Sequence, residues 1–256
     1  MANKSQPVRA SVSWKDNLTV ALVESRNPLN IGAAARAMRN FGFTRLALVA
    51  PYDAAFREAR SAVGAADVLQ NAQLAADLDA VLADCTLVAG TATARGRVKR
   101  QPGSTLGGAA SLLRAHLKRE RAALLFGSEK FGLSNEHLSR CQWTLTIPTD
   151  PDCPSLNLGQ AVAVCCYELA RAPASAPRAP ARPRLGRATA AQSQRMVEKL
   201  LALLDAAGYI NPLTRRSQRL KIRRLVERLE ISTDDARVLE GMLRQIAWKL
   251  DRQSGR

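Results

Sequence analysis

The chain has 256 residues, 46% of them hydrophobic, and a formal net charge of +16. This length allows one medium-sized domain with a sizeable core and a second, smaller unit. No apolar run reaches about eighteen residues, which argues against a membrane span, and the N-terminus lacks an apolar core of signal-peptide length. We therefore expect a cytosolic protein with no membrane partner.

The basic excess extends over both halves of the chain. Residues 1–172 hold 20 Lys and Arg against 14 Asp and Glu, a balance of +6, and residues 173–256 hold 18 against 8, a balance of +10. Such an excess indicates a polyanionic partner, most often nucleic acid. The alternative is a basic surface with no particular partner.

The five cysteines do not indicate a metal site. No C-x-x-C pair occurs, and the two histidines are not spaced as ligands with them. We therefore predict no metal, and we expect Cys85, Cys165 and Cys166, which lie in apolar segments, to be small core residues.

Strands alternate with helices from residue 18 to residue 171. We expect Asn30 to cap the first helix. Short apolar strands in such an alternation imply an α/β fold, a parallel sheet with helices on both faces. The predicted strands are 18–23, 45–49, 86–89, 122–126 and 143–147, and the predicted helices are 31–41, segments within 53–84, 105–117, a short one after Ser134 and one after Asn157.

Three loops with unusual chemistry follow predicted strands: 90–97, 127–132 and 148–157. Ligands of such sheets bind beyond the carboxyl ends of the strands. The third loop is stiff because it holds three prolines, and it brings Ser155 and Asn157 to a helix N-terminus. The alternative is a simple turn in which Ser155 or Asn157 caps the helix. No G-x-G-x-x-G pattern follows the first strand, so a nicotinamide site is poorly supported.

The last third of the chain differs in composition. Residues 172–187 hold four prolines and read as a basic linker. Three amphipathic helices follow, at about 192–207, 215–229 and 233–250. In the second, seven of fifteen residues are Lys or Arg, which favours phosphate contact over plain solvation, with an inner face predicted from Leu220, Ile222, Leu225, Val226 and Leu229. We divide the chain into a flexible N-terminus (1–17), an α/β domain (18–171), a linker (172–191) and a basic helical extension (192–256).

Three blocks of the sequence carry a family resemblance. They are NIGAAARAMR (30–39), LFGSEKFGL (125–133) and the segment 147–158, which runs from IP to SLNL. In this order and spacing they resemble the signature motifs of the SPOUT RNA 2′-O-methyltransferases, over residues 18–171. The opening VESRNPLNIGAAARAM, the TATARGR loop and the helical extension are most similar to the TrmJ branch, the tRNA (cytidine/uridine-2′-O-)-methyltransferases of position 32.

The resemblance implies a C-terminal deep trefoil knot in the sheet, S-adenosylmethionine as the cofactor, and a homodimer in which the partner's first helix completes each site. Glycine, proline and small residues in stiff loops suit the cofactor role, since they offer backbone groups at close range. Carried over to this sequence, the cofactor-binding residues are Thr91, Ala92, Thr93, Gly127, Ile147, Ser155 and Leu156.

The same resemblance gives Arg36 as the catalytic residue, with Ser155 near the reacting centre. Because arginine stays protonated, we expect Arg36 to hold the ribose and its phosphate and to stabilise the developing alkoxide. We expect Arg95 and Arg97 to contact RNA as well. The alternatives are a surface arginine on a helix for Arg36 and a solvated loop for Arg95 and Arg97.

We therefore expect S-adenosylmethionine-dependent 2′-O-methylation of ribose in tRNA, at cytidine or uridine 32. Two alternatives stay open. The enzyme could act on ribosomal RNA or on another tRNA position, or the chain could be an RNA-binding SPOUT protein that has lost catalysis, against which the presence of Arg36 and Ser155 argues.

Overall fold

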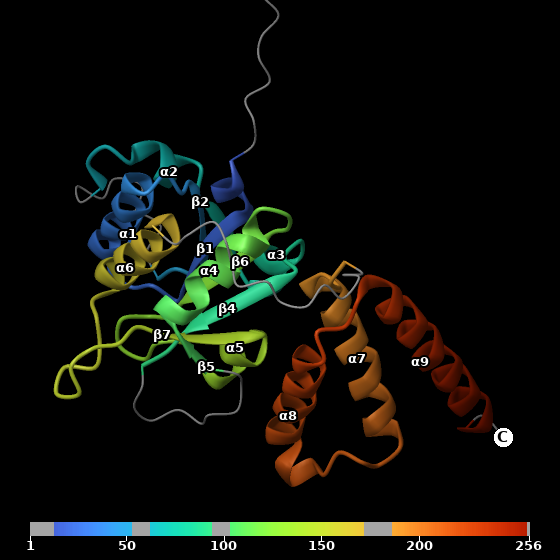
Figure 1. The fold of residues 1–256 in the computed structure, drawn as a ribbon. Coiled ribbons are helices and arrows are strands. Elements are labelled where there is room, and N and C mark those ends of the chain that lie inside the picture. The colour runs from blue at the N-terminus through green and yellow to red at the C-terminus, as the bar shows by residue number, and fades with distance from the viewer. Residues whose placement is uncertain (1–12, 53–61, 94–102, 172–185, 255–256) are drawn as a thin grey trace, which may run out of the picture.

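The computed structural model describes residues 13–52, 62–93, 103–171 and 186–254 (Figure 1). Its centre is one sheet of seven strands in the order β3-β2-β1-β6-β4-β7-β5, and every neighbouring pair is parallel. The strands are β1 (Leu18–Val23), β2 (Arg45–Val49), β3 (Gln73–Ala75), β4 (Leu87–Thr91), β5 (Gly103–Thr105), β6 (Ala122–Phe126) and β7 (Trp143–Thr146). The predicted parallel sheet is confirmed, although β3 and β5 were not among the predicted strands.

The helices of the described ranges alternate with these strands and then continue alone. No described helix is both long and apolar enough to cross a bilayer. The α-helices are α1 (Pro28–Asn40), α2 (Ala66–Gln70), α3 (Leu78–Leu82), α4 (Leu106–Leu117), α5 (Asn135–Ser139), α6 (Leu158–Arg171), α7 (Ala190–Ala206), α8 (Arg215–Arg228) and α9 (Thr233–Ser254), and two short 3-10 helices are η1 (Trp14–Asn17) and η4 (Pro212–Thr214).

Alternate residues of the central strands enter two separate cores. Val20 and Leu22 of β1 belong to one core with α1, α2, α4 and α6, while Ala21 and Val23 belong to the other with α3 and α5. This alternation follows from the two-residue period of a strand. It confirms that helices cover both faces. The cysteines Cys85, Cys165 and Cys166 are buried in these cores, as predicted.

The first helix begins earlier than the sequence predicted. Its N-cap is Asn27, whose side chain accepts a hydrogen bond of 2.9 Å from the Leu29 N–H, and Pro28 takes the first helical position. Proline suits that position because it needs no donor there and its φ is already helical. The prediction that Asn30 caps the helix is therefore wrong.

Helices α1 and α6 lie side by side on one face of the sheet (Figure 1). A Cβ atom added at Gly159 of α6 would lie 2.7 Å from the Cβ of Ala33 on α1. Small residues on both helices therefore let α1 and α6 approach closely. The trefoil knot implied by the family resemblance stays a prediction.

The last three helices, α7, α8 and α9, form a core of their own, built on Met196, Val197, Leu201, Ile210 and Val226. The extension also contacts the sheet domain, since the Arg224 guanidinium donates to the Asn135 carbonyl at 3.2 Å. The predicted inner face of α8 is partly wrong. Leu225 and Leu229 are 48% and 60% exposed, and Arg224 and Glu227 are buried instead, because they face the polar surface of α5.

Candidate active site

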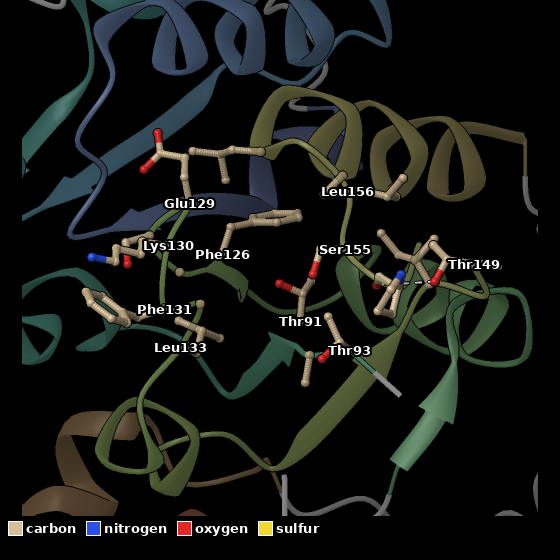
Figure 2. Close-up of a pocket in the computed structure, with 18 residues that line it drawn as sticks. Thr91, Thr93, Phe126, Glu129, Lys130, Phe131, Leu133, Thr149, Ser155 and Leu156 are labelled. Carbon is tan, nitrogen blue, oxygen red and sulfur yellow. Dashed lines mark hydrogen bonds between the residues drawn. The ribbon is translucent and has the colours of Figure 1, made fainter. Parts of the chain in front are cut away.

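A cavity of about 340 Å³ opens beyond the carboxyl ends of β4, β6 and β7 (Figure 2). Its walls come from three segments far apart in the sequence: the end of β4, the loop after β6, and the proline-rich loop between β7 and α6. All seven residues predicted to bind the cofactor line this one cavity, namely Thr91, Ala92, Thr93, Gly127, Ile147, Ser155 and Leu156.

The loop after β6 is closed too tightly for a side chain at Gly127. A Cβ atom there would lie 2.0 Å from the Gly132 carbonyl carbon and 2.1 Å from the Leu133 nitrogen. Gly132 has a φ of 62°, a left-handed value that favours glycine, and its N–H donates to the Ser128 carbonyl at 2.8 Å. The wall is therefore a compact turn with no room for a side chain at Gly127.

The other two walls are fixed by side-chain hydroxyl groups. The Thr91 hydroxyl donates to the Leu125 carbonyl at 2.9 Å and ties β4 to β6. The Thr149 hydroxyl donates to the Pro154 carbonyl at 3.2 Å and folds the proline-rich loop (Figure 2). These bonds hold the walls in place before any ligand binds, which lowers the entropic cost of binding.

Ser155 is available to a ligand, whereas Asn157 is used by the protein. The side-chain oxygen of Asn157 accepts from the N–H of Gly159 at 2.9 Å and so caps α6. Ser155 is exposed at the cavity wall, and within the described residues its hydroxyl makes no hydrogen bond. Of the two residues that could have capped the helix, Asn157 does so.

The cavity fits the cofactor that the family resemblance implies. Its volume lies at the lower end of the range for small-molecule sites, roughly 300–1,000 Å³. The hydroxyl of Ser128, a lining residue, is buried and has no hydrogen-bond partner among the described residues. Such a group favours a ligand with polar atoms. That these residues bind S-adenosylmethionine stays a prediction.

A chain of polar side chains ties the three motif blocks together beside the cavity. The Asn157 amide donates to the Asn30 side-chain oxygen at 2.9 Å, and the Asn30 amide donates to the Glu129 carboxylate at 2.9 Å. Glu129 also accepts from the N–H groups of Arg26 and Asn27, at 3.2 and 3.3 Å. Partial burial raises the pKa of Glu129, but the hydrogen bonds outweigh burial and hold its pKa below the ordinary value.

The sequence did not predict this connection. Asn30 was expected to cap a helix and Asn157 to lie at a helix N-terminus, and no contact between the blocks was predicted. The signal that could have predicted these contacts is that each motif block holds one polar residue able to form them, namely Asn30, Glu129 and Asn157.

The structure does not bring Arg36 into this cavity. Arg36 is exposed on α1, and it is not among the residues lining the cavity. Within the described part of the chain it makes no hydrogen bond or ion pair. Arg95 and Arg97 lie outside the described residues. The predicted site residues therefore divide into a cavity wall that is assembled and a guanidinium that points elsewhere.

Comparison with known proteins also leads to RNA methyltransferases, as the sequence motifs did. Residues 17–167 match the model of the SpoU rRNA Methylase family. A protein of Pseudomonas aeruginosa (strain UCBPP-PA14) named tRNA (cytidine/uridine/adenosine-2′-O-)-methyltransferase TrmJ is 35% identical over 89% of this chain and 93% of its own length. A Klebsiella pneumoniae protein named tRNA (cytidine/uridine-2′-O-)-methyltransferase TrmJ is 34% identical over 90% and 96%. The crystal structure of TrmJ from Z. mobilis ZM4 superimposes with a TM-score of 0.80 at 29% identity, over 90% of this chain and 98% of that one.

Proposed function

The chain belongs to the SpoU rRNA methylase family, and on that premise we propose that it transfers a methyl group from S-adenosylmethionine to a ribose 2′-hydroxyl of tRNA. The observation that carries the proposal is the single cavity formed by Thr91, Gly127 and Ser155, which come from three segments far apart in the sequence. The similar proteins named as tRNA 2′-O-methyltransferases support the substrate. We propose cytidine or uridine at position 32 as the target, and a division at residues 171 and 191 into catalytic domain, linker and extension.

The chemistry requires a ribose oxygen to approach in line and to lose its proton. When bound, the cofactor supplies a methyl group on a positively charged sulfur. The backbone of the loops at Ala92, Gly127 and Leu156 would hold it, and the Ser155 hydroxyl would accept a hydrogen bond from the 2′-hydroxyl. Arg36 would hold the neighbouring phosphate and stabilise the alkoxide, as a fixed positive charge does.

We further propose that the active form is a homodimer in the cytoplasm, where tRNA is found. Arg36 is exposed and away from the cavity of its own chain, so the role proposed for it needs a second copy whose α1 faces this cavity. Leu29 on α1 and Tyr167 on α6 are 56% and 50% exposed, which supports an interface there. Mixing inactive Arg36→Ala with inactive Ser155→Ala should restore activity, because one site of each mixed dimer is intact.

Ribosomal RNA is the second candidate substrate. It is favoured by the name of the matching family and by a Haemophilus influenzae protein, 29% identical, that is named an uncharacterized tRNA/rRNA methyltransferase. Mapping 2′-O-methyl groups in total RNA of a deletion strain separates the two. Loss of a ribosomal mark with tRNA position 32 unchanged would reject the tRNA assignment.

Arg36→Ala is the direct test of the mechanism. We expect its kcat to fall by about 100-fold or more, as when one group that stabilises a transition state is removed. Cofactor binding measured by calorimetry should stay unchanged, because the proposed contacts of Arg36 are with the ribose and its phosphate and not with the cofactor.

Arg39→Ala is the matched control, one turn along the same helix, where Arg39 pairs with Asp67 at 3.2 Å on the surface. It should keep near-normal turnover. An Arg36→Ala enzyme that turns over like Arg39→Ala would remove Arg36 from the mechanism.

A further inference from the structure

Helix α8 has a buried face that carries charge. Glu227 is 6% exposed and Arg224 is 7% exposed. The cations Arg216, Arg219 and Lys221 are exposed on the same helix. Buried ionic groups are costly unless they are hydrogen-bonded, so this face needs specific partners.

The partner of Glu227 is a glutamine from the sheet domain. The backbone N–H of Val88 on β4 donates to the side-chain oxygen of Gln142 at 2.6 Å. The backbone N–H of Gln142 in turn donates to the Val88 carbonyl at 2.9 Å. With its oxygen held there, the Gln142 amide must point its NH₂ group away from β4. That group donates to the Glu227 carboxylate at 2.6 Å.

Arg224 makes the second contact, at the other end of α5. Its guanidinium donates to the carbonyl and to the side-chain oxygen of Asn135, at 3.2 and 3.3 Å. Helix α8 lies beside α5 (Figure 1). Since Asn135 is the first residue of α5 and Gln142 follows its end, α8 makes contacts near both ends of this helix. Two separated, directional contacts fix orientation as well as position.

Strand β4, to which Gln142 is bonded, and helix α5, to which Arg224 is bonded, both lie next to segments that line the cavity. Val88 lies three positions before Thr91 on β4. Helix α5 follows the loop 127–133, which forms a wall. A shift of α8 relative to these elements would therefore move its exposed cations relative to the methyl-transfer site.

We propose that Gln142, Arg224 and Glu227, the docking cluster, hold α8 in one orientation, so that tRNA bound along its exposed face presents the target ribose at the cavity. This inference rests on the proposed function. The three are positioning residues, since none of them lines the cavity. The chemistry of the partner is a phosphate backbone, which Arg216, Arg219 and Lys221 suit.

The test compares two substitutions at Glu227 in the full chain. Glu227→Leu removes both the acceptor and the charge, whereas Glu227→Gln keeps an acceptor for Gln142. We expect Glu227→Leu to raise KM for full-length tRNA by about tenfold, which corresponds to about 1.4 kcal/mol. KM for a short hairpin carrying only the target loop should stay unchanged, and Glu227→Gln should restore most of the loss.

Controls keep the result interpretable. Asp234→Asn removes an exposed carboxylate of α9, which pairs with Arg237 one turn away, and should change neither KM. If Glu227→Leu does not fold, Arg224→Met tests the other contact in the same way. Equal loss with tRNA and hairpin, or no loss with either, would overturn the proposal.

Failure of the proposed function would look different. Wild-type protein would then methylate neither RNA. The docking cluster would still be tested by hydrogen exchange, since Glu227→Leu should speed exchange in α5 and α8 and leave α1 and α6 unchanged. Unchanged exchange in α5 and α8 would also overturn the proposal.

Discussion

Two helix contacts in this protein are built on opposite principles. Between α1 and α6, Gly159 meets Ala33 so closely that no extra carbon fits. Between α5 and α8, the buried groups are Arg224, Glu227 and Gln142. Gln142 donates to Glu227 at 2.6 Å, and Arg224 donates to Asn135 at 3.2 and 3.3 Å. The first contact depends on shape and the second on directional polar bonds.

The difference suits what each contact supports. A close-packed interior cannot take up small changes in volume without strain, so α1, α6 and the loop 127–133 hold the cavity in one form. A polar contact stabilises less on balance, because its groups lose water when they are buried. It specifies orientation and responds to pH, which suits the role in RNA binding that we propose for the extension.

Among the substitutions in the close-packed region, Gly127→Ala should have the largest effect. The added methyl group would collide with the backbone of Gly132 and Leu133, which cannot move aside as a flexible side chain could. Overpacking of this kind costs about 1–3 kcal/mol, and the displaced loop is a wall of the cavity. We expect cofactor affinity, measured by calorimetry, to fall by at least about tenfold.

Gly107→Ala is the control, because nothing lies within 4 Å of a Cβ atom at that position on α4. It should leave cofactor affinity unchanged and raise stability by about 0.5–1 kcal/mol. Equal cofactor affinities for the two variants would show that the tight turn does not shape the site.

A smaller effect should follow from Asn157→Ala. This change removes the cap of α6 and the bond to Asn30 that joins the motif blocks. Loss of an N-cap costs about 0.5–2 kcal/mol, so thermal unfolding should shift downward while the fold stays intact. Asn71→Ala, which removes an exposed bond to the Asp67 carbonyl, should cost less than about 0.5 kcal/mol. Equal shifts would mean that the tie between the motif blocks adds no stability.

The sequence allowed the close-packed region to be predicted much better than the polar contact. Short apolar strands and the glycine- and proline-rich loops after them are local signals, and they placed β1, β2, β4, β6 and β7 and the cavity loops. Strands β3 and β5 have three residues each, too few for a period to show.

The inner face of α8 could not be predicted from its own residues. An apolar period predicted Leu225 and Leu229 inside, but the surface that α8 meets carries Asn135 and Gln142, some 85 positions or more away in the chain. Burial of Arg224 and Glu227 is favourable only beside those groups. The same limit explains Asn30, whose partners Glu129 and Asn157 lie 99 and 127 positions away.

The smallest effect should be a pH dependence of the polar contact. Burial raises the pKa of Glu227 to about 7, and the Gln142 hydrogen bond, Arg223 and Arg140 limit the rise. A carboxyl group with a raised pKa holds its proton more tightly when docked. Docking is therefore strongest below the ordinary pKa and weakens as pH rises through about 7. One released proton predicts that the docking equilibrium falls by about tenfold from pH 6 to pH 8.

The pKa of Glu227 depends on the charged groups of the helices that pack around it. Arg223 on α8 and Arg140 at the end of α5 act directly on Glu227. These two cations in turn face Glu136 of α5, Glu198 of α7, and Asp77 and Asp79 at α3. Because docking stays favourable at both pH values, KM for tRNA should rise only slightly, while hydrogen exchange in α8 should quicken clearly. In Glu227→Gln, which cannot ionise, exchange in α8 should keep one pH profile once the intrinsic rate is divided out. A Glu227→Gln profile identical to that of the wild type would assign the titration to another group and leave the polar contact insensitive to pH.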